Sequence, residues 1–92
     1  QEQAGFLVDH LALLAARQGQ HDAAAQLAAW SNVWYSAHGH QREANEVRAL
    51  EEAAAIARQA LGDEGWARAV EQGAALDDVG ALQIARSATG AH

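Results

Sequence analysis

Apolar residues recur along this chain at helical spacing, and glycines interrupt the recurrence. Leu7, Leu11 and Leu14 follow one another at i, i+4 and i+7, which places them on one face of a helix. We therefore predict a first helix over about residues 2–18, with this leucine face packed on the next helix. Gly19 follows it, and glycine readily takes the left-handed conformation that ends helices.

The second predicted helix spans about residues 22–37. Asp22 is the expected N-cap, because its carboxylate can accept hydrogen bonds from free N–H groups of the first turn. The expected inner stripe consists of Ala23, Leu27, Trp30 and Trp34. Tyr35 falls on another face and is expected to be partly exposed. Gly39 is expected to end this helix in the left-handed conformation.

A third helix is predicted over about residues 41–61, apolar on two sides and therefore lying between two neighbours. The two sides comprise Val47, Leu50, Ala54, Ala57 and Leu61, and Ala49, Ala53, Ile56 and Ala60. Gly62 is expected to end it, and Asp63 to cap a fourth helix.

The last predicted helix begins at Leu76-Asp77, an apolar residue followed by an N-cap. Val79, Leu82 and Ala85 recur along it, and residues 88–92 are expected to fray. Five helices joined by breaks of a few residues must pack as antiparallel neighbours. The predicted fold is therefore all-α, with about five helices in stacked, tetratricopeptide-like hairpins.

Composition changes how such a core must be built. The chain has 92 residues, enough for one domain, predicted over residues 2–87. It contains 25 alanines against 9 leucines and no proline. A core of small side chains requires helices to approach closely. The chain begins at Gln1 and contains no methionine, so we expect it to be part of a longer protein.

The charge balance excludes one class of partner. Twelve acidic residues and six arginines give a formal net charge of −6, which repels a phosphate backbone. We therefore expect no direct nucleic-acid binding. No apolar run is long enough to span a bilayer and no signal peptide is recognisable, so no membrane role is expected. With no cysteine, a cytoplasmic location is the expectation.

The first two helices have two possible readings. A DNA-reading helix-turn-helix needs basic residues on its second helix, and residues 22–37 contain no arginine or lysine. The tetratricopeptide pattern fits better, because small residues occupy the positions where its two helices approach. The matching positions are Leu11, Ala12, Gly19, Ala24 and Ser31, while Val8 and Ala15 stand where aromatic residues are usual.

Residues 7–86 contain "LALLAARQGQHDAAAQLAAW" and "ARQALGDEGWARAVEQGAALDDVGALQIA". These stretches resemble the C-terminal region of large bacterial ATP-binding transcriptional regulators, the LuxR-type and predicted ATPase family. The resemblance implies a tetratricopeptide-like regulatory or scaffolding tail. The chain departs from the family at residues 38–43, "HGHQRE", where a proline-containing segment is common. It also has no phosphate-binding G-x-x-x-x-G-K-[ST] motif.

Candidate chemistry is sparse. His38, His40 and Glu43 have no fourth ligand or cysteine support, so we expect an exposed turn and no metal site. No nucleophile, base and orienting group can be assembled, so neither an enzyme nor a cofactor is expected. Trp30 and Trp34 are predicted to fill the core. The alternative is a small-molecule sensor with a cavity lined by these two residues and Trp66.

A second stripe on the first helix is the candidate contact with a partner. It consists of Phe6, His10, Leu13 and Arg17, which the packing of the second helix does not need. The expected partners are upstream repeats of the parent chain, a peptide, or a second copy in a homodimer. Packing onto a later helix of the same chain is the competing outcome. The predicted function is therefore a non-catalytic interaction or regulatory module.

Overall fold

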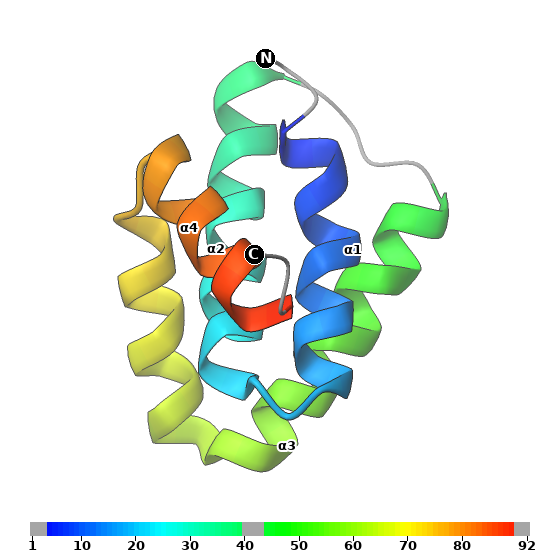
Figure 1. The fold of residues 1–92 in the computed structure, drawn as a ribbon, viewed down its shortest axis with the longest axis vertical. Coiled ribbons are helices and arrows are strands. Elements are labelled where there is room, and N and C mark those ends of the chain that lie inside the picture. The colour runs from blue at the N-terminus through cyan, green and yellow to red at the C-terminus, as the bar shows by residue number, and fades with distance from the viewer. Residues whose placement is uncertain (1–3, 40–43, 90–92) are drawn as a thin grey trace.

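The computed structural model describes residues 4–39 and 44–89. Every regular element in these two ranges is an α-helix, which confirms the all-α class for the described chain. The helices are α1 (Ala4–Arg17), α2 (His21–His38), α3 (Ala44–Ala74) and α4 (Asp78–Thr89). Figure 1 shows α1 and α2 side by side and antiparallel, with α3 flanking them on both sides and α4 crossing in front.

The turn between α1 and α2 is closed by backbone groups. Gly19 has φ 84°, as expected for a residue that ends a helix, and the N–H of Gln20 donates to the carbonyl of Ala15 at 2.8 Å. The expected cap at Asp22 is wrong. Helix α2 already begins at His21, after Gln20, and no side chain caps this end. Its other end closes as expected, with Gly39 at φ 68°.

Gly62 bends α3 and does not end it. This residue has φ 76° and ψ 172°, with helical backbone on both sides. The described chain therefore has four helices, where about five were expected, because the predicted third and fourth helices join at this kink. We call residues 44–61 the first arm and residues 63–74 the second arm; Figure 1 shows them on opposite sides of the α1–α2 pair.

The start of α4 is fixed by the cap that the sequence predicts. The carboxylate of Asp77 accepts a hydrogen bond from the N–H of Gly80 at 2.7 Å, and its backbone carbonyl accepts one from Ala81 at 3.0 Å. The chain therefore turns sharply after α3, and α4 runs back across α1 and α2, both of which it contacts.

Alanines make most of the core. All four helices contribute them, and the buried set is Ala12, Ala15, Ala16, Ala24, Ala25, Ala28, Ala29, Ala49, Ala53, Ala57, Ala69, Ala81 and Ala85. Helices α1 and α2 lie at the centre, because each of them contacts all of the other three helices. A side chain of one methyl group lets these helices approach closely, and close approach replaces the bulk that leucines usually supply.

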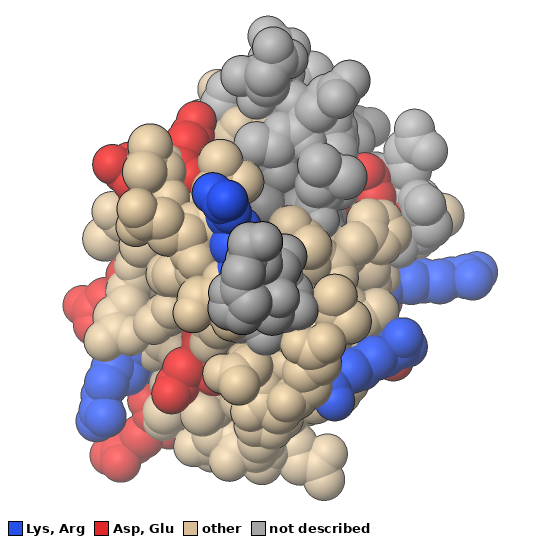
Figure 2. Space-filling view, in the orientation of Figure 1, with Lys and Arg blue, Asp and Glu red and all other residues tan. Residues whose placement is uncertain are grey.

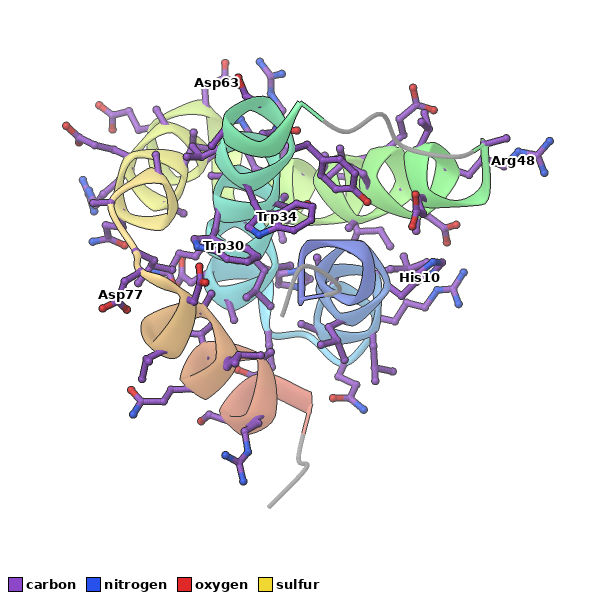
Figure 3. All side chains as sticks on the ribbon, turned by 90° about the horizontal axis from the view of Figure 1, so that it is seen from above. His10, Trp30, Trp34, Arg48, Asp63 and Asp77 are labelled. Atoms are coloured by element: carbon purple, nitrogen blue, oxygen red, sulfur yellow. The ribbon has the colours of Figure 1, made fainter. Side chains whose placement is uncertain are left out.

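The large rings of the core come from α2. Trp30 and Trp34 are 3% and 4% exposed, which confirms them as core residues. Figure 3 shows both beside α2 in the interior, while Asp63 and Asp77 lie at the periphery. Tyr35 was expected to be partly exposed, and this expectation is wrong, because it is 4% exposed. Its ring packs edge-to-face on Trp34, with centroids 5.3 Å apart.

A glycine sets the distance between α2 and the second arm. Gly73 is buried, and a Cβ atom at this position would lie 2.1 Å from the carbonyl oxygen of Gln26. The neighbouring side chains join across the same contact, where Nε2 of Gln26 donates to Oε1 of Gln72 at 2.8 Å. The second arm and α2 thus approach each other at backbone distance.

Candidate functional site

The described residues of the stripe predicted as a partner contact differ in their exposure to solvent. His10 is exposed, and Figure 3 shows it at the outer side of α1. Leu13 is partly buried against the core, and Arg17 is exposed. The side chain of Phe6 lies outside the described residues. The stripe is therefore not one continuous free surface.

Arg17 forms an ion pair between one edge of α1 and the first arm of α3. Its guanidinium lies 2.6 Å from the carboxylate of Glu52 on the first arm of α3. Both side chains are about half exposed, at 58% and 48%, so solvent screens the pair and its contribution to stability is small. The contact still places this edge of α1 against α3, which is the intramolecular outcome considered for the stripe.

Leu14 is the large apolar residue that α1 exposes among residues 10–17, whose side chains the structure describes. It was expected to pack on α2, and this expectation is wrong, because its side chain is 41% exposed. The inner face of α1 is formed instead by Ala12, Ala15 and Ala16. These small residues bring the neighbouring helices close, and a leucine in that face would hold them apart.

Helix α4 shows the same arrangement. Its inner face carries Ala81 and Ala85, at 0% and 2% exposure. Val79 and Leu82 lie three residues apart on the outside and are 63% and 43% exposed. We call Leu14, Val79 and Leu82 the outer apolar residues; they belong to two helices that contact each other.

Charges on the described surface are mixed. Figure 2 shows arginine and acidic side chains interspersed on the face that carries α4, with neither sign gathered into a stripe. Arg58 and Asp63, for example, approach at 3.4 Å while remaining 62% and 89% exposed. On this face, the described arginines form no continuous basic track.

An open pocket of about 270 Å³ lies between the start of α2 and the end of α4. It is lined by Gln20, Asp22, Ala23, Gln26, Ile84 and Ser87. The lining is mostly polar, and none of the three tryptophans belongs to it. The cavity expected for the sensor alternative would have been lined by Trp30, Trp34 and Trp66, of which the first two fill the core and the third is partly buried against it.

The histidine-rich turn considered for a metal falls outside the description. His40 and Glu43 belong to the residues that are not described, as does the side chain of His38. Among the residues that the structure describes, no three histidine or acidic side chains gather in a way that would hold a metal ion. No helix of the described chain is both long and apolar enough to cross a bilayer.

Sequence reasoning missed the outer apolar residues because it took the largest apolar side chains to mark the buried face. A different signal was present. Alanines recur at four-residue spacing in α3, at Ala49, Ala53 and Ala57, and again in α4, at Ala81 and Ala85. In a chain with so many alanines, this small-residue stripe marks the buried face, and it leaves larger apolar residues outside.

Comparison of the chain with known protein families, with curated proteins and with solved structures found no match.

Proposed function

We propose that this chain is a non-catalytic protein-interaction module, and that the outer apolar residues of α1 and α4 dock on another protein surface. Three of the five large apolar residues exposed in the described chain lie on α1 and α4, two helices in contact with each other, and they carry this proposal. The buried core consists of other residues, mainly alanines and aromatic rings, and these three residues remain 41–63% exposed. Burial against a partner would remove their apolar surface from water, which is the main favourable term in association.

The proposal extends to a tetratricopeptide-like tail of a bacterial transcriptional regulator. Two features support it: an antiparallel α1–α2 pair closed at Gly19, and small buried residues on both of its helices, such as Ala12 and Ser31. Small residues at such positions are what a helical hairpin repeat requires. In this proposal the partner is a helix of the parent chain, a peptide, or a second copy.

Self-association of the purified chain is the accessible test. The partner in this test is a second copy, which meets the same outer apolar residues in a two-fold contact. We expect the weight-average mass, measured by sedimentation equilibrium, to rise as concentration increases from micromolar to millimolar. The variant Leu14→Glu should remain monomeric over the same range with unchanged helical content.

The matched control adds the same charge without removing apolar surface. Gln18 is exposed directly after the end of α1, four residues from Leu14, so Gln18→Glu should leave self-association almost unchanged. The pair Leu82→Glu and Gln83→Glu repeats the comparison on α4, where both positions are exposed. A wild-type chain that stays monomeric at millimolar concentration, or glutamates that weaken association equally at all four positions, would contradict the proposal.

A further inference from the structure

One residue alone bends α3. The helix covers 31 residues, and of these Gly62 has the non-helical angles, φ 76° and ψ 172°. This region of backbone conformation is populated almost entirely by glycine. No loop separates the two arms, since helical residues lie directly on either side of the kink. Rotation at this single residue is therefore enough to make α3 straight.

Local contacts do little to hold the kink. Gly62 is exposed, and a Cβ atom built on it would meet nothing within 4 Å. The ion pair across the bend joins Arg58 to Asp63, and both side chains are largely exposed, so it is weak. The bend is maintained instead by the packing of the segment that follows it.

We call residues 63–89, which comprise the second arm and α4, the C-terminal segment. It packs on the remainder of the bundle at specific points: Gly73 against the backbone of Gln26, and Ala81 and Ala85 in the core. All of these contacts are to residues before the kink. An identical bundle in another molecule offers the same contacts to the same segment.

The length of a straight α3 determines where the C-terminal segment can pack. A straight helix of 31 residues is about 46 Å long, whereas the longest extent of the molecule is 30 Å. Straightening therefore carries the C-terminal segment beyond its own bundle. It also uncovers the apolar surface beneath α4 and the second arm, which only an equivalent segment would cover with the same fit.

We infer that Gly62 is the hinge of a domain exchange, in which α3 straightens and each C-terminal segment completes the bundle of a second copy. The product is a two-fold dimer with two continuous α3 helices. The contacts of the C-terminal segment with α1 and α2 re-form between chains, while the contacts among the residues before the kink stay within each chain. This inference goes beyond the docking proposed for the outer apolar residues and does not depend on it.

Substitution at the hinge should shift the balance between monomer and exchanged dimer. Gly62→Ala is strained in the bent chain, because L residues avoid this φ, and it favours a straight helix. Two hinges straighten in each dimer, so we expect the dimer dissociation constant to fall by about a hundredfold or more. The same substitution made with D-alanine by chemical synthesis favours positive φ and should keep the chain monomeric.

Cross-linking separates this dimer from one formed through the outer apolar residues. The chain has no cysteine, so Gln26→Cys together with Gln72→Cys introduces the only two thiols, at positions now in contact. A short bis-maleimide reagent should join two chains covalently in the Gly62→Ala background. It should close a link within one chain in the D-alanine background.

Three results would overturn the inference. One is a Gly62→Ala chain that stays monomeric at millimolar concentration. The second is a dimer in which the two thiols link only within a chain, since that dimer keeps its bend. The third is a Gly62→Ala chain that loses helical content, because a continuous α3 requires helicity to be kept. In the Gly62→Ala background, Leu14→Glu should leave the exchanged dimer intact, so the two modes of association fail separately.

Discussion

Replacing Gly73 by alanine probes the closest contact in the fold. The added Cβ atom would lie 2.1 Å from the carbonyl oxygen and 2.6 Å from the Cα atom of Gln26. Both are backbone atoms, so no side-chain rotation relieves the overlap. The second arm and α2 must separate by more than about 1 Å to restore an ordinary contact.

The magnitude follows from two opposing effects. Overpacking of a close-packed core costs about 1–3 kcal/mol, and a clash with backbone belongs at the upper end of that range. Alanine in place of glycine within a helix recovers about 1 kcal/mol. We therefore expect Gly73→Ala to lower the free energy of unfolding by about 2 kcal/mol. For a domain of this size that corresponds to a fall in Tm of about 8–16 °C.

Urea denaturation followed by circular dichroism and tryptophan fluorescence measures this change. Gly65→Ala is the matched control, because Gly65 lies in the same arm and its added Cβ atom would meet no backbone atom, only the side chain of Leu61, whose Cβ atom lies 3.1 Å away. The control should change stability by less than about 1 kcal/mol. A Gly73→Ala chain as stable as the wild type would refute the backbone approach of the second arm to α2.

Further predictions concern the core, the cap of α4 and nucleic acid. Trp34→Ala should cost about 3–5 kcal/mol, a large part of the stability of a small domain, and an unchanged Tm would place Trp34 outside the core. Asp77→Ala removes the carboxylate that accepts the N–H of Gly80 and should cost about 1 kcal/mol in urea denaturation, whereas Asp77→Asn should retain most of the cap. The chain should not shift duplex DNA in a gel at physiological salt, because its net charge of −6 repels phosphate, and a salt-sensitive shift would contradict this.

Helix ends were predictable where backbone chemistry alone determines them. Gly19 and Gly39 take the left-handed conformation expected of them, and Asp77 caps α4 as its position before an apolar helix indicated. Each of these features depends on a few neighbouring residues. Such local preferences can be recognised without knowing how the helices pack.

Gly62 shows the limit of that local reasoning. Its sequence context favours a helix end as much as a bend, since glycine permits both. The packing of residues 63–89 on the rest of the bundle decides the outcome, and those contacts are distant in sequence. Asp22 fails as a cap for a related reason, because α2 starts at His21, so Asp22 lies inside the first turn and not at the N-cap position.

The buried faces were the hardest feature to predict. Helical periodicity finds an apolar stripe, but Leu14 and Leu82 give the same signal as a core residue. Whether the core accepts a leucine or an alanine depends on the spacing between helices. That spacing is set here by Gly73 and by the buried alanines. For this reason the partner surface predicted from the sequence includes Leu13, whereas the surface proposed from the structure includes Leu14.

The most direct test of the proposed interaction surface is a dilution series of ¹⁵N-¹H correlation spectra of the wild-type chain. From micromolar to millimolar concentration, we expect progressive shift changes confined to amides around Leu14, Val79 and Leu82. The amides of the buried alanines, such as Ala53, should stay in place. Spectra that do not change with concentration, or changes centred on the far arm of α3, would contradict docking through the outer apolar residues.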